Sequence, residues 1–404
     1  MRIIIVGNNV AGTTLAKTLR DANPDVEIDI YTDEALPYYP RPRLVDYLMG
    51  RYDEKEMPFY PMEWYEKNRL RLHLNSRAEK LDPLGRRILV GGSWEGYDRL
   101  ALCTGSSAFI PPFQGLPKKR VFTLRTFQDA KDIKSTAGVS RHSIVIGGGL
   151  LGLETARGIC TAFPELRVTI LEYAEHLLMR QLDHEGAALL KKWIEGTGTS
   201  VVTQAETVEI LGDENATGVK LKDGRVIEGD MIVISAGTRA NTQLAKDAGL
   251  KVNKGIVVDS HLRTSDPNIY SIGDACEFQG AVWAMIPPAL DEAKVAANSM
   301  LGLPGPEYPG SVPSNTLKVV GFDLTSIGTV RGAHEPSEPS FEEIIALSSD
   351  GNVYKKFVIK DDRLIGAILL GTKKDSLKIT RMIKEGTPVG EIKQHLSDPS
   401  YALP

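Results

Sequence analysis

A glycine-rich turn near the middle of the chain has a spacing suited to binding phosphate. It follows a short apolar run over residues 143–146 and precedes a helical stretch. The first glycine permits a tight turn, the second lets the backbone approach a pyrophosphate, and the third lets the helix pack close to the strand. The helix N-terminus offers free N–H groups and a partial positive charge. The alternative is a β–α turn without a ligand. The predicted dinucleotide contacts are Gly147, Gly149, Leu150, Leu151 and Gly152.

An acidic residue after the next apolar run complements this turn. Glu172 follows residues 168–171, where it can accept hydrogen bonds from both hydroxyls of an adenosine ribose and repel a 2′-phosphate. Residues 173–176 contain no Arg or Lys that would pair with such a phosphate. The sequence therefore favours NADH over NADPH. Early in the helix, Glu154 is a candidate for orienting the nicotinamide; the alternative is an acid in the first turn, favoured by the helix dipole.

An internal repeat predicts a second phosphate site. Shifting the sequence by 140 positions places residues 2–34 on residues 142–174, with glycines again at the first and third positions of the turn. The middle position is an asparagine, which tolerates the left-handed backbone conformation better than most residues. The predicted contacts of this copy are Gly7, Asn9, Val10, Ala11 and Gly12.

The acid of the first copy is less clearly placed. Thr32 occupies the position that matches Glu172, and two acids come directly after it. Glu34 is favoured for the ribose role, with Asp33 and Thr32 as alternatives.

Two further segments resemble parts of nucleotide sites. Residues 98–105 and 230–237 both predict a short buried strand that ends in a small-residue turn. A third apolar strand ends in Gly273 and Asp274, and helical residues are expected to follow. An aspartate there can bind a ribityl hydroxyl, while the new helix end favours a phosphate. The alternative for Asp274 is an ordinary N-cap.

These motifs need parallel β-α-β units to hold them. An apolar run, a turn, a helical stretch and a second apolar run occur in both copies of the repeat. A chain of 404 residues has room for two or three domains. Past about residue 310, short strands over residues 319–330 and 353–370 precede an amphipathic helix over 375–385. The predicted fold is α/β, with two Rossmann-like domains and a small α+β C-terminal domain.

Composition excludes several classes of function. The net charge of −4 argues against a general nucleic-acid binder. The chain has 3 cysteines, none within short spacing of another, so neither a disulfide framework nor a cysteine metal motif is predicted. The apolar run over residues 3–6 is too short for a signal peptide or a membrane span. We expect a cytoplasmic protein that has no metal site and does not bind membranes.

The combined pattern resembles the pyridine nucleotide–disulfide oxidoreductase family over nearly the whole chain. The resemblance implies FAD on the first glycine-rich turn and NAD(P)H on the second. It implies a split FAD domain, 1–112 and 238–310, an inserted NAD domain, 113–237, and a C-terminal domain, 311–404. It adds Thr104, Gly105, Gly273 and Asp274 to the FAD site, and Gly237, near the return crossing, to the NAD site.

Two segments narrow the resemblance within that family. Residues 37–44 resemble NAD(P)H:rubredoxin oxidoreductases and the ferredoxin reductases of aromatic dioxygenase systems, and Asp46 favours the former, since the latter typically carry Lys there. The resemblance places Arg41 and Arg43 beside the FAD; the alternative is ordinary surface charge. Residues 315–324 and 354–371 resemble the FAD portion of NADH-dependent nitrite reductase large subunits. The cysteines of their iron–sulfur and sirohaem domains are absent, so a free-standing reductase is expected.

The cysteine positions argue against thiol chemistry. Residues 33–92 contain no cysteine, although disulfide reductases of this fold carry reactive thiols in that region. Cys103, Cys160 and Cys276 are expected to pack as small apolar side chains, and His395 to lie on the surface. The flavin itself then does the chemistry without a catalytic side chain, and residues 284–288 are expected near its ring.

These inferences lead to one main functional hypothesis. We expect an NADH-dependent reductase of a small, acidic one-electron carrier of the rubredoxin or ferredoxin type. A candidate docking patch consists of Lys373, Lys374, Lys378 and Arg381, with a solvated helix face as its alternative. The alternative functions are an NADH oxidase acting on oxygen and a nonenzymatic flavin redox sensor.

Overall fold

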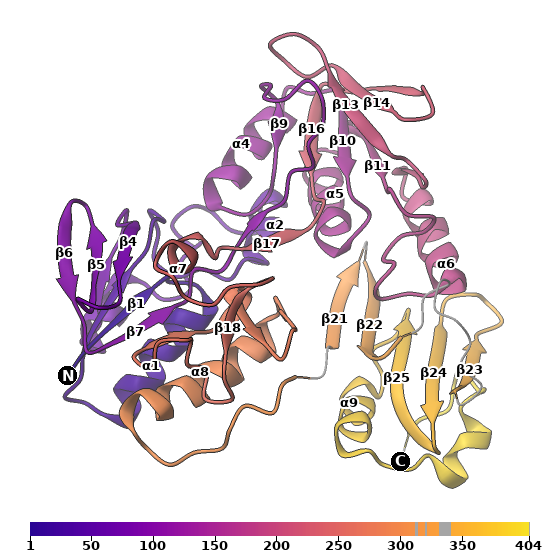
Figure 1. The fold of residues 1–404 in the computed structure, drawn as a ribbon. Helices are drawn as coiled ribbons and strands as arrows, with labels where there is room; N and C mark the ends of the chain where they lie inside the picture. Colours follow the sequence, from indigo (N-terminus) through magenta and orange to yellow (C-terminus); the bar gives the residue numbers. More distant parts are fainter. Residues whose placement is uncertain (312–313, 320, 331–340, 404) are drawn as a thin grey trace. The chain divides into compact units, whose positions relative to one another are not determined.

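The computed structural model describes residues 1–311, 314–319, 321–330 and 341–403 (Figure 1). It divides into two compact units, each made from two stretches of the chain. The first unit comprises Met1–Phe109 and Thr238–Ser311, and the second comprises Ile110–Gly237 and Val312–Pro404. Each unit contains a parallel sheet with helices, which confirms the α/β class. The finer division into three domains, with boundaries at 112, 237 and 310, stays a prediction.

The internal repeat is a repeated β-α-β unit. The strand, helix and second strand have the same lengths in both copies, and every boundary is displaced by 140 positions. In each copy the two strands pair in parallel. The first copy is β1 (Arg2–Val6), α1 (Val10–Ala22) and β2 (Glu27–Tyr31), and the second is β10 (His142–Ile146), α5 (Leu150–Ala162) and β11 (Arg167–Leu171).

The first unit is built on a five-stranded parallel sheet of order β19-β7-β1-β2-β3. Strand β19 comes from the second stretch of the unit and pairs with β7, so both stretches are needed to complete the sheet. Helices α1 and α8 lie side by side (Figure 1). The other strands of this sheet are β3 (Arg71–His73), β7 (Arg99–Leu102) and β19 (Ile269–Ser271), and α8 spans Ile286–Leu301.

Smaller elements complete the first unit. A three-stranded antiparallel sheet has the order β4-β5-β6, and two two-stranded sheets are β17-β8 and β18-β20. Their bounds are β4 (Ala78–Asp82), β5 (Arg87–Val90), β6 (Ser93–Gly96), β8 (Ser106–Ala108), β17 (Thr238–Ala240), β18 (Ile256–Val258) and β20 (Cys276–Phe278). The short helices are α2 (Arg43–Leu48), α3 (Met62–Lys67), α7 (Gln243–Asp247) and the 3₁₀ turn η1 (Gly273–Ala275).

The second unit contains a parallel sheet of order β12-β11-β10-β16-β9 and a smaller antiparallel sheet, β13-β14-β15. The strands are β9 (Val121–Phe122), β12 (Ser200–Val202), β13 (Thr207–Leu211), β14 (Gly218–Leu221), β15 (Val226–Glu228) and β16 (Met231–Ile234). Its further helices are α4 (Phe127–Ala137) and α6 (His184–Glu195).

The C-terminal part of the second unit is a five-stranded antiparallel sheet of order β21-β22-β25-β24-β23. Helix α9 (Ser376–Glu385), which follows the predicted boundaries closely, packs on β22 and β25. The predicted strand regions are confirmed as parts of hairpins, apart from Val320, which lies outside the described residues. The elements are β21 (Ser314–Val319), β22 (Phe322–Gly328), β23 (Phe341–Leu347), β24 (Tyr354–Lys360), β25 (Arg363–Leu370) and the 3₁₀ helix η2 (Gly390–His395).

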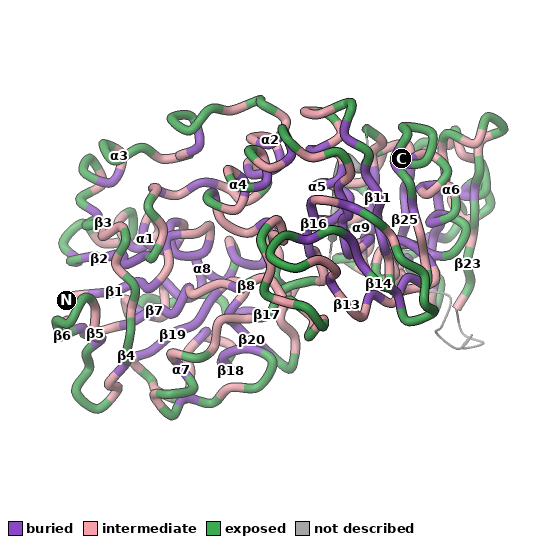
Figure 2. Tube along the Cα trace, turned by 90° about the horizontal axis from the view of Figure 1, so that it is seen from above, coloured by how far each residue is buried: buried purple, intermediate pink, exposed green. Residues whose placement is uncertain are grey.

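The parallel strands form the cores of the two units (Figure 2). Ile3, Ile4 and Ile5 of β1 are all fully buried, and all four residues of β16 are buried as well. Strands that are buried on both faces lose the alternating pattern and become continuous apolar runs. This is why these strands were easy to recognise in the sequence. Among the described residues, no helix is both long and apolar enough to cross a membrane.

One predicted element is wrong. The residues after Asp274 were expected to be helical, but they form the single turn η1 and then strand β20. Pairing with β18 accounts for the strand, since it satisfies the backbone of β20 and buries Cys276 and Phe278. The long helix α8 begins only at Ile286, with prolines in its first turn, where their missing N–H groups cost nothing.

Candidate functional site

The first and third glycines of both turns are required by the backbone itself. A Cβ added at Gly12 would lie 2.0 Å from the carbonyl oxygen of Gly7, and one added at Gly152 would lie 2.0 Å from that of Gly147. Gly7 and Gly147 have φ of +110° and +121° and approach the carbonyls of the neighbouring strand ends equally closely. No other residue fits these four positions without a shift of the backbone.

The middle position of each turn is open. A Cβ at Gly149 would meet nothing within 4 Å, so the space in front of this residue is free for a ligand. Asn9 has φ −89° and ψ −170°, an extended conformation. The left-handed conformation considered for Asn9 is therefore wrong. An asparagine fits because any residue adopts an extended backbone and because Asn9 lines an open hollow.

Both glycine-rich turns lead into helices without side-chain caps. Asn9 and Gly149 are the N-caps of α1 and α5, and neither makes a side-chain capping bond. Helices α4 and α6, in contrast, are capped by Thr126 and Asp183. The first-turn N–H groups of α1 and α5, which include those of Val10, Ala11, Leu150 and Leu151, therefore suit an anion such as a pyrophosphate.

Glu172 is fixed at the mouth of the second turn. Its Oε2 accepts a hydrogen bond from the N–H of Gly148 at 2.6 Å, and its Oε1 accepts one from the N–H of Ala174 at 2.7 Å. A carboxylate has further acceptor positions, which ribose hydroxyls can use. Gly148 was not singled out from the sequence, yet a Cβ there would lie 2.8 Å from Glu172 Oε2. The run of three consecutive glycines at 147–149 was the sequence feature that could have indicated the role of Gly148.

Glu154 is the fifth residue of α5, one position past the first turn. No acidic residue occurs in the first turn of α5, and the Glu154 side chain is half-buried. The helix-dipole alternative for Glu154 therefore loses its basis. Its role in orienting a nicotinamide stays a prediction.

The acids of the first copy have different surroundings. Thr32 is buried, Asp33 is exposed, and Glu34 is half-buried. The hydroxyl of Tyr39 donates to Glu34 Oε2 at 2.6 Å, and Arg41 forms an ion pair with Glu34 at 2.5 Å. The Glu34 carboxylate is therefore neutralised and oriented by the loop that follows it. These residues border an open hollow, which is lined by Asn8, Asn9, Thr32, Glu34, Leu36, Pro37, Tyr38 and Tyr39.

Asn8 contributes an unsatisfied donor to this hollow. Its Oδ1 accepts hydrogen bonds from Thr13 Oγ1 and from the hydroxyl of Tyr65, both at 3.1 Å. Its Nδ2 is buried and has no partner among the described atoms. A buried N–H without a partner costs about 1–3 kcal/mol, so a ligand oxygen that accepts this bond would be stabilised.

Arg43 holds a loop together. Its Nη1 donates to the carbonyl oxygens of Glu56 and Met57 at 3.0 Å and to that of Pro58 at 3.2 Å. The guanidinium also lies over the ring of Phe59. This arrangement differs from the ordinary surface charge considered as the alternative. A place beside the flavin stays a prediction for Arg43 and for Arg41.

The two other segments predicted for FAD lie together beside the first turn. Ser106 Oγ donates to Asp274 Oδ2 at 2.7 Å, so the residues after β7 and β19 are joined. A Cβ on Gly273 would lie 2.9 Å from the Cβ of Ala11. Asn241 makes two hydrogen bonds with Thr104. Its backbone carbonyl accepts from the Thr104 hydroxyl at 2.7 Å, and its Nδ2 donates to the Thr104 carbonyl at 2.8 Å. Gly105 follows with φ +66°.

Glu292 is a residue that the sequence analysis missed. Its Oε2 accepts a hydrogen bond from the N–H of Gly273 at 2.6 Å, and the side chain is buried beneath the Gly273–Asp274 turn. Burial raises the pKa of Glu292 to about 7. The adjacent acids Asp291 and Glu292, in an otherwise alanine-rich stretch of α8, were the sequence feature that could have indicated it.

The cysteines lie where thiol chemistry is disfavoured. Cys103 and Cys276 are buried, Cys160 is partly buried, and none forms a disulfide. Burial raises the pKa of all three thiols above its usual value. Since the thiolate is the reactive form, these side chains are poor nucleophiles.

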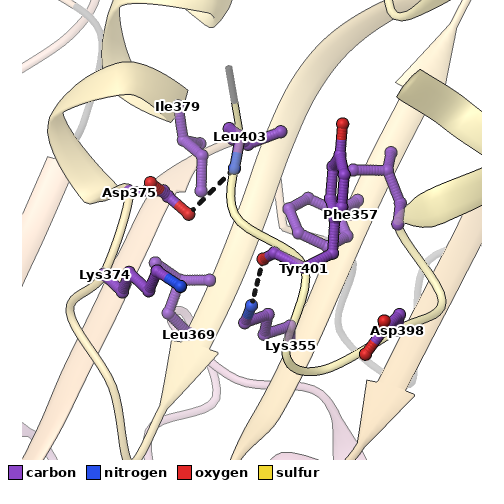
Figure 3. A pocket seen from close by; sticks show the side chains of 10 residues that line it. Lys355, Phe357, Leu369, Lys374, Asp375, Ile379, Asp398, Tyr401 and Leu403 are labelled. Carbon is purple, nitrogen blue, oxygen red and sulfur yellow. Dashed lines mark hydrogen bonds between the residues drawn. The ribbon is translucent and has the colours of Figure 1, made fainter. Parts of the chain in front are cut away.

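The predicted basic patch lies on and before α9. Lys373, Lys374, Lys378 and Arg381 are exposed, and Leu377 among them is 86% exposed. Beside α9, a pocket in the same domain is lined in part by residues near the C-terminus of the chain (Figure 3). There Lys355 Nζ donates to the Tyr401 carbonyl at 3.1 Å, and the N–H of Leu403 donates to Asp375 at 3.1 Å.

Comparisons with known proteins agree with this geometry. Residues 1–299 match the model of the pyridine nucleotide-disulphide oxidoreductases, and residues 313–387 match that of the rubredoxin NAD⁺ reductase C-terminal domain. The chain is 33% identical over 392 residues to a nitrite reductase [NAD(P)H] of Bacillus subtilis, which covers 96% of this chain and 48% of the relative. It is 32% identical over 347 residues to an NADH oxidase of Methanocaldococcus jannaschii, covering 81% and 76%.

A solved structure is similar over its whole length. The NADH:rubredoxin oxidoreductase of Clostridium acetobutylicum aligns with a TM-score of 0.79 and 26% identity, and the alignment covers 97% of both chains. In contrast, the chain spans about half the length of the nitrite reductases that it matches.

Proposed function

This chain belongs to the pyridine nucleotide-disulphide oxidoreductase family, and from that premise we propose that it oxidises NADH and passes the electrons to a small redox carrier of the rubredoxin or ferredoxin type. The observation that carries the proposal is the presence of two glycine-rich phosphate cradles in a chain with two buried thiols and one partly buried thiol. Such a chain offers two dinucleotide sites, and its thiols, whose pKa values are raised, are poorly suited to relay electrons.

FAD fits the first cradle. The uncapped α1 N-terminus suits its pyrophosphate, Asp274 suits a ribityl hydroxyl, and the unpartnered Nδ2 of Asn8 suits a further oxygen. When bound, FAD supplies the ability to take up two electrons together and release them singly, which nicotinamide lacks. The protein residues bind and orient the cofactor.

NADH fits the second cradle. The uncapped N-terminus of α5 suits the pyrophosphate, and Glu172 suits the adenosine ribose. Since Glu172 carries a negative charge at the ribose position, a 2′-phosphate would be repelled, and we propose NADH over NADPH.

The carrier would dock on the basic residues around α9. Small iron–sulfur carriers are usually acidic, and a positive patch attracts them and speeds their association. Leu377 supplies an exposed apolar centre among the charges, as is usual in protein interfaces. The C-terminal domain of the family that matches this part of the chain is named after rubredoxin reductases, which supports the same class of carrier.

An absorbance titration and a steady-state assay test the proposal together. We expect the purified protein to be yellow and to bleach on addition of NADH under nitrogen. Turnover of NADH should then be fast with a rubredoxin or a ferredoxin and slow with oxygen alone. A colourless protein that cannot be loaded with FAD would overturn the proposal.

An NADH oxidase is the second candidate, and the similarity to the Methanocaldococcus jannaschii enzyme favours it. Fast turnover with oxygen alone, without a carrier, would select this alternative. A flavin redox sensor would show neither activity, but would form a stable complex with NADH.

A further inference from the structure

We infer that the C-terminal domain braces the NADH site through residues 173–183, and that Asp183, Tyr354 and Lys356 are positioning residues for NADH binding. We call residues 173–183 the brace segment. The inference rests on the proposed assignment of NADH to the second cradle. It adds a function for the C-terminal domain that is independent of the electron carrier.

One end of the brace segment is bonded to the phosphate turn. The N–H of Leu178 donates to the carbonyl oxygen of Gly148 at 3.1 Å, while the N–H of Gly148 donates to Glu172 at 2.6 Å. A Cβ on Gly148 would lie 2.5 Å from Cδ2 of Leu177, so the side chain of Leu177 also covers this glycine. The N–H and the C=O of Gly148 are therefore both held in place by hydrogen bonds, one to Glu172 and one to the brace segment.

The brace segment is strained at Leu178. This buried leucine has φ +54°, in the left-handed region that branched side chains avoid. Its carbonyl oxygen accepts hydrogen bonds from the N–H groups of Gln181 and Leu182, at 2.8 and 2.9 Å. A conformation of this kind costs about 1–3 kcal/mol and persists only where the surroundings hold it in place.

The other end of the brace segment is held by the C-terminal sheet. Asp183 Oδ1 caps α6 by accepting from the N–H of Gly186 at 3.0 Å. Its Oδ2 accepts from the hydroxyl of Tyr354 at 2.6 Å and lies 3.0 Å from Nζ of Lys356. Lys356 also pairs with Glu343 at 2.9 Å. The Lys356 and Asp183 side chains are 5% and 10% exposed, so removing the Lys356 charge leaves the Asp183 carboxylate buried without a cation beside it.

Helix α6, which begins at this anchor, is itself packed on the sheet. Trp193 of α6 stacks on Phe322 of β22, with ring centroids 4.1 Å apart. A Cβ on Gly186 would approach Cδ1 of Leu370 to 3.2 Å, so the first turn of α6 lies against β25. The contact of Asp183 with Tyr354 and Lys356 is therefore part of a tightly packed interface. A change in β24 is expected to shift Asp183 directly.

A loosened anchor would affect binding more than the redox step. If Asp183 is released, Leu178 can relax toward a negative φ, and its bond to Gly148 shifts together with Glu172. These groups face the pyrophosphate and the adenosine ribose in the proposed site. Contacts with that half of NADH are the same in the ground state and the transition state, so their loss raises KM and leaves kcat unchanged.

The test compares two lysines that are neighbours on β24. Lys356→Met removes the cation beside Asp183, whereas Lys355→Met removes a buried cation that bonds the C-terminal segment instead (Figure 3). Tyr354→Phe removes only the hydroxyl that donates to Asp183. Binding of ADP-ribose and of NADH is measured by calorimetry on the flavin-loaded proteins. NADH oxidation is followed with ferricyanide, which needs no docking site.

We expect ADP-ribose to bind about three- to tenfold more weakly to Lys356→Met and about twofold more weakly to Tyr354→Phe. KM for NADH should rise in parallel while kcat stays within about twofold, and Lys355→Met should match the wild type. If Lys356→Met does not fold, Tyr354→Phe decides alone, since it removes a single oxygen atom.

Equal losses in Lys355→Met and Lys356→Met would overturn the inference, because the effect would then come from general damage to the C-terminal domain. Unchanged ADP-ribose affinity in both anchor variants would overturn it too. A wild-type protein that binds neither NADH nor ADP-ribose would instead contradict the proposed function.

Discussion

Single residues decide whether the two phosphate cradles can hold a dinucleotide, and the third glycine of each turn is the most sensitive. Gly12→Ala would place a Cβ 2.0 Å from the Gly7 carbonyl, and Gly152→Ala would do the same at Gly147. We expect Gly12→Ala to weaken FAD binding about a hundredfold or more, which corresponds to ~3 kcal/mol. Gly152→Ala should keep the yellow colour and lose NADH affinity instead.

The ratio of flavin to protein absorbance after purification measures the first effect, and calorimetry with ADP-ribose measures the second. Loss of flavin from both variants would indicate unfolding, so circular dichroism is recorded alongside. A Gly12→Ala protein that retains its flavin would contradict the assignment of FAD to the first turn.

Glu292 predicts a pH dependence of stability. Its pKa is raised from 4.5 to about 7 in the folded protein, so the folded state holds the proton more tightly than the unfolded state. This contribution to stability is fully present below pH 4.5 and is lost as the pH rises through 7, for a total of about 3 kcal/mol. Glu292→Gln cannot titrate, so its stability should fall less over that range.

The urea midpoint, followed by flavin fluorescence from pH 5 to pH 8, checks this prediction. Asp274, Asp291, Tyr308, Cys103 and Cys276 surround the carboxyl and are unchanged in the variant. Parallel curves for the wild type and Glu292→Gln would show that Glu292 does not titrate as described.

Residues whose role depends on nearby sequence were predictable, and residues whose role depends on distant partners were not. The turn glycines and Glu172 follow from the spacing within one β-α-β unit. Glu292 and Asp183 act through Gly273 and Tyr354, which the sequence alone does not bring near them. The conformation of Asn9 was misjudged because the matching residue is a glycine, which suggests a left-handed backbone, whereas the middle position is extended in both turns.

At the scale of elements, periodic patterns predicted the β-α-β repeats and α9, since each contains its own signal. Strand β20 was missed because its conformation comes from pairing with β18, which lies earlier in the chain. Local propensity after Asp274 favoured a helix, and tertiary pairing overrode it.

Helix α9 and the residues before it should control carrier docking. A double charge reversal, Lys374→Glu with Arg381→Glu, replaces two exposed cations with anions, which repel an acidic carrier. We expect KM for rubredoxin or ferredoxin to rise about tenfold, with KM for NADH unchanged, and the dependence of the rate on salt to become weaker.

Lys246→Glu with Lys251→Glu, in the first unit, is the matched control, because it also replaces two exposed cations with anions. An equal rise in KM for this control would point to net charge rather than to a docking surface. Unchanged carrier kinetics in the double variant would favour the solvated-face alternative for α9.

At the scale of the whole molecule, each nucleotide should protect a different unit. FAD is proposed to bind the unit that contains β1 and α1, and NADH the unit that contains β10 and α5. At a ligand concentration of 100 times Kd, binding stabilises the host by about 2.7 kcal/mol. Hydrogen exchange followed by mass spectrometry should therefore slow in Met1–Phe109 with FAD and in Ile110–Gly237 with ADP-ribose.

Protection of both units by ADP-ribose alone would contradict the assignment of one nucleotide to each cradle. The sequence predicted the α/β class because the repeat is visible in the residues themselves. It did not reveal that the C-terminal sheet shares a compact unit with the second cradle, since the contacts of Asp183 and Trp193 join residues far apart in the chain.

The placement of β19 next to β7 has a consequence for synthesis of the chain. Residues 110–237 leave the ribosome after β7 and before β19, so a newly made β7 lacks the neighbour on one side while they are translated. At cellular translation rates of about 5–20 residues per second, this interval lasts about six to twenty-six seconds. During that time the open side of β7 presents unpaired N–H and C=O groups to other nascent chains. Chaperones that shield such edges should therefore raise the yield of this protein, and crowded overexpression should lower it.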